Sequence, residues 1–249
     1  GWSLCIDANN GTLIFKVGDG KGAVQTVSLS RPLVQDRWFQ VTGQYDAVKG
    51  KLMVSAEPVI GSTTRELAWS AETAESELPS DMQVPQQGPL RFGAATGGAG
   101  NGTRLRPVDV LNGKLDAVRL ARGVLGPADI KRLAELKPPK DLISDIVGCW
   151  DFAEGIGTTT VHDLSGNQLQ GVAVNMTDRA VTGVRWDREM GSDWRYARDS
   201  YSACHFHDDD LYDAEWQSAF SYQVPKGLAS GVYAVRLRHG DFEDHIPFF

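Results

Sequence analysis

Residues 38–45 read Trp-Phe-Gln-Val-Thr-Gly-Gln-Tyr, a stretch in which the two sets of alternate side chains differ in character. Successive side chains of an extended strand point to opposite faces. One face would carry Phe39, Val41, Gly43 and Tyr45, and the other Trp38, Gln40, Thr42 and Gln44. One largely apolar face is what a half-buried antiparallel strand requires. Residues 46–50 then predict a turn into a second strand, because Gly50 adopts a positive φ at little cost.

Short runs rich in β-forming residues recur along the chain. Predicted turns separate them, and the sequence contains 27 glycines and 11 prolines. This punctuation is typical of a sandwich or a barrel. The predicted strands cover residues 2–7, 12–17, 24–28, 38–45, 51–56, 90–93, 113–121, 146–152, 158–162, 169–174, 204–207, 219–224, 231–237 and 245–249. The sequence therefore predicts a mainly β, antiparallel fold.

The remaining segments are predicted as loops, one linker and one helix. Residues 61–89 are polar and predict a solvated loop, and the glycine-rich residues 97–102 predict a second loop. That second loop lacks the following helix that a phosphate cradle needs. Residues 127–136 predict a helix, since Pro127 suits its first turn. The proline-rich residues 138–141 are the best linker candidate.

Composition excludes several classes of protein. The 249 residues are 41% hydrophobic and 23% charged, which suits a packed core rather than a disordered chain. A net charge of −7 argues against nucleic acid or an anionic membrane as partner. No run approaches the roughly 20 apolar residues that cross a bilayer, and no secretory signal opens the chain. We expect a cytoplasmic protein whose Cys5, Cys149 and Cys204 are reduced.

The chain is predicted to be a piece of a longer protein, because it starts without Met and its last residues continue an apolar run. Residues 1–185 are expected to form one large β domain. Residues 186–249 are expected to be a linker followed by a small β segment.

Residues 205–210 read His-Phe-His-Asp-Asp-Asp and are the clearest candidate metal ligands. Alternation places His205 and His207 on one face of a strand, with carboxylates just beyond. The run approaches the His-x-His-x-Asp-His motif of metallo-β-lactamase-like hydrolases, but Asp210 stands where that motif needs histidine. The alternative is a polar strand end whose aspartates satisfy turn amides.

Two further carboxylates, Glu154 and Asp163, flank a predicted turn and are interpreted as loop carboxylates or as calcium ligands. The paired-carboxylate strand of glycosidases and the Gly-x-Ser-x-Gly motif do not occur in the sequence. The seven tryptophans could stack on sugars. Trp38 and Trp150, however, stand in predicted strands and are better explained as core residues.

Three motifs in order resemble the laminin-G-like domains, which are concanavalin-A-like jelly rolls. They are residues 37–46, residues 90–93 (Leu-Arg-Phe-Gly) and residues 112–120, which contain Gly-Lys-Leu-Asp-Ala-Val-Arg. Residues 150–155 and 163–167 resemble the segment that normally opens such a domain, although here it comes last. Either a second domain begins there, or circular permutation has moved the opening strands to the end. Permutation is favoured, because few residues follow before the pattern changes.

The last part of the chain resembles the large subunit of the N,N-dimethylformamidases, on residues 205–211, 224–225, 230–237 and 246–249 together with Trp216. The resemblance implies an amidohydrolase that converts dimethylformamide to dimethylamine and formate, with large and small subunits. It also implies a mononuclear iron held by tyrosine and glutamate side chains. Tyr233 is the tyrosine inside the matched stretch and so the iron-ligand candidate. Its alternative is a strand tyrosine packed under residues 225–231, with its hydroxyl bonded to backbone.

The resemblance predicts that the chain is mainly a structural and assembly part of such a subunit, without a complete active site. Its expected partners are a small amide substrate, the small subunit and further large subunits. The alternative function is a carbohydrate- or protein-binding laminin-G-like module without catalysis.

Overall fold

The alternating stretch forms β4 (Phe39–Asp46), which pairs antiparallel with β5 (Lys51–Pro58) as predicted. Phe39 and Val41 pack against a hydrophobic core, and Gly43 faces the ring of Phe15. On the opposite face, Gln40 Nε2 donates to the carbonyl of Ile130 at 2.6 Å. Gln44 Oε1 accepts from the N–H of Leu125 at 2.9 Å. The two faces of this strand therefore bind different parts of the fold, and the predicted alternation is confirmed.

The computed structural model describes residues 1–61, 69–79, 82, 84, 88–96, 107–135, 137, 139–175, 177–187, 193–209 and 217–249. The predicted glycine-rich loop at 97–102 lies outside these residues. The fold is mainly β and its sheets are antiparallel, as predicted. The chain divides into two compact units, Gly1–Asp209 and Asp210–Phe249. No helix in the described part of the chain is both long and apolar enough to cross a membrane.

Two three-stranded sheets enclose the first core of the larger unit. One contains β1 (Trp2–Ile6), β2 (Thr12–Gly18) and β3 (Val24–Pro32), and the other contains β4, β5 and β6 (Glu72–Glu77). The buried residues are Leu13, Phe15, Val17, Val27, Leu29, Leu52, Val54, Ala56 and Trp69. They alternate along β2, β3 and β5, as half-buried strands require.

Strand β6 contradicts the prediction that residues 61–89 form only a solvated loop. Its burial alternates, and it pairs with β5. Glu72 accepts from the N–H and the hydroxyl of Ser30 at 2.6 and 2.7 Å and from Arg31 Nε at 3.1 Å. The loop prediction was wrong because the inward residues of this strand are small or polar and are held by hydrogen bonds to β3.

A second core lies between the other sheets of the same unit. One sheet has the order β10 (Arg119–Ala121), β11 (Ile146–Asp151), β12 (Thr160–Asp163) and β13 (Gly171–Val172). Another has the order β14 (Asp178–Val181), β15 (Ala203–Phe206) and β9 (Gly113–Leu115), and β7 (Ala95–Thr96) pairs with β8 (Pro107–Val108). The buried residues are Trp150, Phe152, Val161 and Cys204.

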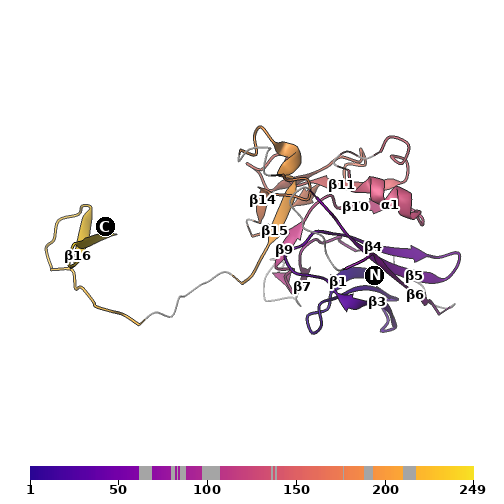
Figure 1. The fold of residues 1–249 in the computed structure, drawn as a ribbon, viewed down its shortest axis with the longest axis horizontal. Coiled ribbons are helices and arrows are strands. Elements are labelled where there is room, and N and C mark those ends of the chain that lie inside the picture. The colour runs from indigo at the N-terminus through magenta and orange to yellow at the C-terminus, as the bar shows by residue number, and fades with distance from the viewer. Residues whose placement is uncertain are drawn as a thin grey trace. The chain divides into compact units, whose positions relative to one another are not determined.

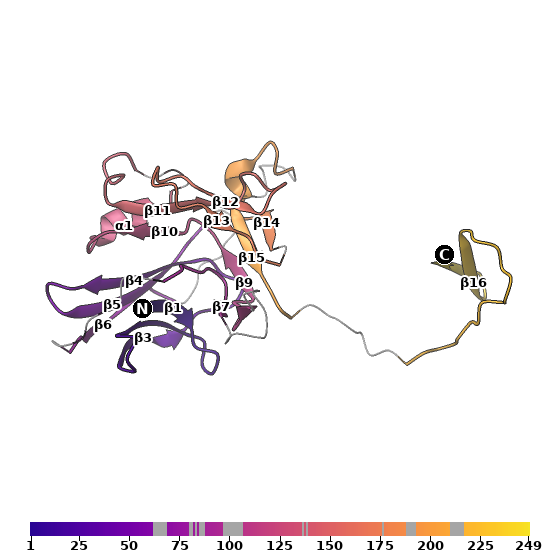
Figure 2. The same ribbon diagram turned by 180° about the vertical axis from the view of Figure 1, so that it is seen from behind.

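Figures 1 and 2 show β4 between β1 and β3 on one side and β10, β11 and α1 on the other.

Strands from the middle of this unit pair with later strands. β10 pairs with β11, and β9 pairs with β15. The predicted linker at 138–141, of which 139–141 are described, thus connects two strands of one sheet instead of two domains. Residues 193–209, including the 3₁₀ turn η1 (Arg198–Ser200), also fold with the first unit. The division between the units falls at 209/210, later than the predicted boundary at 185/186.

The predicted helix is present as α1 (Pro127–Leu133), with Pro127 in its first turn and its end three residues earlier than predicted. Two predicted strands, residues 90–93 and 219–224, are not strands. Gly93 has φ +73° and lies against the ring of Phe206, so the chain turns where the sequence predicted an extended run. No described strand pairs with residues 219–224, although the ring of Tyr222 lies 5.8 Å from that of Phe248 in β17.

The second unit contains one hairpin, β16 (Tyr233–His239) and β17 (Phe242–Phe248). Its register places Tyr233 opposite Phe248, Val235 opposite Ile246 and Leu237 opposite Asp244. The other face carries Arg236 and Arg238, whose guanidinium Nε atoms lie 3.2 and 2.8 Å from Glu243 Oε2. The hairpin therefore has one mostly apolar and one charged face.

Gly43→Ala should lower the free energy of unfolding by about 1–3 kcal/mol, because the added methyl group would lie 2.6 Å from Phe15 in a packed core. Urea denaturation of both proteins would measure the difference. Gly157→Ala is the matched control, since a methyl group there meets no atom within 4 Å. Equal effects of the two substitutions would contradict the packing of β4 on Phe15.

Candidate metal centre

His205 lies in β15 and His207 follows the strand by one residue. Their imidazole rings are stacked, with centroids 4.8 Å apart and ring planes 29° apart. The two side chains therefore lie on the same face, as the alternation predicts. In the three-stranded sheet, His205 is opposite Asp178 of β14 on one side and Lys114 of β9 on the other.

Asp178 joins the two histidines, and sequence reasoning missed it. Its Oδ2 atom lies 3.4 Å from His207 Nε2 and 3.9 Å from His205 Nδ1. The three potential ligand atoms all lie within 4.8 Å of one another. The side chains of His205, His207 and Asp178 are 37%, 25% and 58% exposed. Asp178 is 27 positions from His205 in the sequence, and only the pairing of β14 with β15 brings it there.

The aspartates after His207 do not all point to this cluster. Asn112 Nδ2 donates to Asp208 Oδ1 at 2.9 Å, and the N–H of Asp208 donates to Asn112 Oδ1 at 2.8 Å. The Asp208 carboxylate therefore binds the side chain of Asn112, which directly precedes β9. Asp210, the position that departs from the metallo-β-lactamase-like motif, lies outside the described residues.

Arg179 anchors the strand that presents Asp178. Its guanidinium donates to the carbonyls of Phe152 at 3.1 Å, Thr158 at 3.1 Å, Thr160 at 3.0 Å and Glu154. A bulge follows, with Ala180 at φ +53°. Burial lowers the pKa of Arg179 below its ordinary value, and four carbonyl acceptors favour the charged form.

A second buried charge, Asp116, binds residues that precede β15. Asp116 Oδ2 accepts from the N–H of Val184 and from Ser202 Oγ, both at 2.9 Å. Asp116 Oδ1 lies 3.3 Å from Arg185 Nη2, and the Asp116 side chain is 3% exposed. A side chain at Gly183 would collide with the Asp116 carboxylate. Asp116 is therefore a structural residue in the sequence motif that spans residues 112–120.

Asp163, one of the two candidate calcium ligands, is already surrounded by hydrogen-bond donors. It accepts from the N–H groups of Cys149, Ser165 and Leu169, each at 2.9 Å, and from Ser165 Oγ at 2.7 Å. Burial raises its pKa, but these hydrogen bonds outweigh burial and the pKa is lowered overall. The arrangement is that of a carboxylate that holds a loop together.

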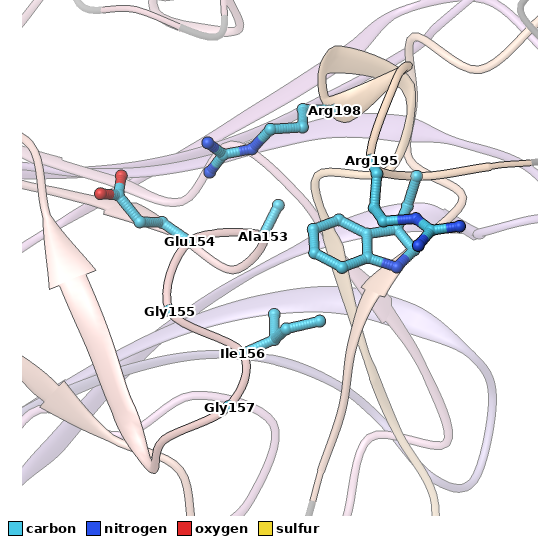
Figure 3. Close-up of a pocket in the computed structure, with 8 residues that line it drawn as sticks. Ala153, Glu154, Gly155, Ile156, Gly157, Arg195 and Arg198 are labelled. Atoms are coloured by element: carbon cyan, nitrogen blue, oxygen red, sulfur yellow. The ribbon is translucent and has the colours of Figure 1, made fainter.

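Glu154 lines an open cavity of about 450 Å³ together with Ala153, Gly155, Ile156, Gly157, Trp194, Arg195 and Arg198. Figure 3 shows Arg198 and Glu154 on one side of this cavity and Arg195 on the other. Arg195 Nη2 lies 2.7 Å from Asp193 Oδ2. The cavity thus combines one aromatic ring with charged side chains of both signs.

Tyr233, the predicted iron ligand, lies in the second unit. Its hydroxyl donates to the carbonyl of Ala229 at 2.7 Å, and its ring stacks on Phe248 with centroids 5.5 Å apart. Glu243 is on the opposite face of the hairpin by register and binds Arg236, Arg238 and His245. The described residues of this unit therefore do not bring a glutamate to Tyr233. These contacts are those of the alternative interpretation, a strand tyrosine bonded to backbone.

The three cysteines are free thiols, with Cys149 and Cys204 buried. Burial raises the pKa of the Cys204 thiol to about 11. Burial also raises the pKa of Cys149. Both thiols stay protonated at neutral pH and act as small core residues.

Comparison with known proteins supports the resemblance found in the sequence. Residues 178–249 match the family described as N,N-dimethylformamidase beta subunit-like, C-terminal. The N,N-dimethylformamidase beta subunit of Alcaligenes sp is 34% identical over 266 residues, which cover 100% of this chain and 33% of that protein. The beta subunit of Paracoccus aminophilus is 33% identical over 260 residues, with the same coverage. The chain is thus similar along its whole length to a segment of these subunits, and it spans about a third of their length.

Asp163→Asn should reduce stability by about 1–3 kcal/mol at pH 7, because an amide cannot accept all four hydrogen bonds. The lowered pKa of Asp163 stabilises the fold above the unfolded-state pKa of about 3.9, and that contribution is lost as pH falls through the folded-state pKa. The gap between the wild type and the variant should therefore narrow below about pH 4. Thermal unfolding across pH 3–7 tests this, with the exposed Asp36→Asn as control. A gap that stays constant to pH 3 would refute the role of the ionised carboxylate.

Proposed function

We propose, from the similarity of the whole chain to one third of the N,N-dimethylformamidase beta subunits, that this chain is part of an amidohydrolase subunit. The complete protein would hydrolyse N,N-dimethylformamide or a related small amide to an amine and formate. The observation that carries this proposal is identity of 33–34% along the entire chain with two such subunits.

Within that subunit, the chain would act mainly as a structural and assembly domain. The charged groups in its first unit support this role. Asp116, Asp163 and Arg179 are bound to backbone N–H or carbonyl groups of their own unit. Side chains committed in this way hold loops and strands in place, and they leave little freedom to bind a substrate.

The first unit would be a laminin-G-like jelly roll with circularly permuted strands. The pairing of β10 with β11 and of β9 with β15 supports permutation, because the segment that resembles an opening segment completes the body that precedes it. In this proposal residues 1–185 form most of the sandwich. Residues 186–249 supply its last strand, β15, and lead toward a catalytic domain.

The iron that the resemblance implies would be held by residues outside the described part of this chain. Tyr233 and Glu243 do not form a shared site, since they lie on opposite faces of the hairpin. An iron with tyrosine and glutamate ligands would act as a Lewis acid in amide hydrolysis. This chain would position the domain that contains it.

The partners in this proposal are a small subunit and further large subunits, within the cytoplasm. The names of the relatives as beta subunits support an assembly of more than one kind of chain. A net charge of −7 supports the absence of a nucleic-acid or anionic-membrane partner.

A carbohydrate-binding module is the second candidate, and one observation favours it. Trp194 and the Arg198 and Glu154 side chains line an open cavity, a combination that can stack on and hydrogen-bond a sugar ring. The cavity is shallow and Arg195 is already paired with Asp193, so the amidohydrolase proposal is preferred.

The complete protein, purified with its partner chains, should release formate and dimethylamine from N,N-dimethylformamide in equal amounts. Enzymatic formate detection and amine chromatography would measure the two products. Calorimetric titration with simple oligosaccharides serves as the comparison. Sugar binding without any amide hydrolysis would overturn the proposal in favour of the binding module.

Arg185→Met should destabilise the protein by about 3 kcal/mol, because it leaves the buried Asp116 carboxylate without its cation. If the chain has a structural role, the KM of correctly assembled enzyme for the amide should not change. Thermal unfolding and steady-state kinetics would be measured on the same preparation. The exposed Arg91→Met is the control and should change neither. A large rise in KM with unchanged stability would contradict the structural role.

A further inference from the structure

We propose that Asp178, His205 and His207 bind a divalent transition metal of the zinc type. The three donors come from neighbouring strands of one sheet and converge on one point. The site does not depend on the proposed amidohydrolase activity.

One of the donor distances already fits such an ion, and the others are close to it. Zinc binds histidine nitrogen and carboxylate oxygen at about 2.0–2.2 Å, which places tetrahedral ligand atoms about 3.3–3.6 Å apart. The distance from Asp178 Oδ2 to His207 Nε2 is 3.4 Å, and that to His205 Nδ1 is 3.9 Å. The remaining separations are at most 4.8 Å, so an ion would have to draw the imidazole side chains closer together.

The kind of donor selects the metal. Two imidazoles and one carboxylate suit zinc, cobalt, nickel or copper, whereas calcium and magnesium prefer oxygen ligands alone. Three protein ligands leave a coordination position for water.

The backbone around the donors is held in place before any ion binds. Arg179, next to Asp178, binds four carbonyls of the segment 152–160. The Asn112–Asp208 pair fixes the chain directly after His207. Anchoring of this kind reduces the ordering that a metal would otherwise have to impose.

Lys114 is the cation paired with His205 in the sheet register, and its ammonium group is bound elsewhere. Lys114 lies opposite His205, but its ammonium group donates to Thr182 Oγ1 at 2.7 Å and to the Thr182 carbonyl at 3.3 Å. Thr182 is four residues along the chain from Asp178, and the bulge at Ala180 lies between them. Asp178 belongs to the cluster itself, and Asp208 and Asp209 follow His207 in the sequence. All three carboxylates contribute negative charge that favours a cation.

An ion here would join β14 to the end of β15, directly before the boundary between the two compact units. It would stabilise the last strand pair of the first unit, a structural role.

Titration of the metal-free full chain with zinc at pH 7.5, followed by calorimetry, tests the proposal. We expect one equivalent to bind, and cobalt to give the visible absorption of a four-coordinate site with nitrogen and oxygen ligands. His205→Gln, His207→Gln and Asp178→Asn should each weaken zinc binding at least about 10-fold. His239→Gln, a histidine on the hairpin, is the matched control and should bind as the wild type does.

Unfolding temperatures with zinc and with chelator provide a second measurement. Zinc should raise the unfolding temperature of the wild type and of His239→Gln, but not of the three cluster variants. Failure of the wild type to bind one equivalent, or equal affinity in all variants, would overturn the site. Unfolding temperatures in chelator show whether a variant still folds. If a variant does not fold, the zinc titration of the wild type still shows whether one equivalent binds.

Discussion

The buried carboxylate of Asp116 joins the middle of the chain to its later part, and the larger unit depends on this connection. Asp116 follows β9, while its partners Val184, Arg185 and Ser202 lie on either side of the turn that leads into β15. A carboxylate that is 3% exposed is tolerated only with such partners, because an unpaired buried charge is costly. Forming the network therefore requires β15 to be beside β9. This requirement selects the arrangement in which late strands complete an early sheet.

The same principle recurs at two other points of the unit, with backbone groups as the partners. Asp163 accepts from one N–H group of β11 and from two N–H groups and one hydroxyl of the loop between β12 and β13. Arg179 collects four carbonyls from residues 152–160. These segments have little regular structure, so their backbone groups need side-chain partners when they are removed from water. Charged side chains here replace the hydrogen bonds that longer strands would supply.

The sequence predicts the strands whose two faces differ in polarity, and it fails where the partner of a residue is distant in the chain. β4 was predicted correctly because Phe39 and Val41 alternate with Gln40 and Thr42. β6 was missed because hydrogen bonds from Ser30 and Arg31, about 40 residues away, hold Glu72. Asp178 was missed for the same reason, since its place beside His205 follows from the register of β14 with β15. His205 and His207 needed no such information, because their spacing alone puts both on one face.

The region that matches the N,N-dimethylformamidase family begins at residue 178, the first residue of β14, and extends through the hairpin. It therefore includes both the metal-ligand candidates of the first unit and the whole described part of the second. The hairpin has a mostly apolar face formed by Tyr233, Val235, Ile246 and Phe248. A two-stranded hairpin gains independent stability only when such a face packs on further structure. Phe248 on that face also contacts Tyr222, with ring centroids 5.8 Å apart, so residues before the hairpin supply part of this packing.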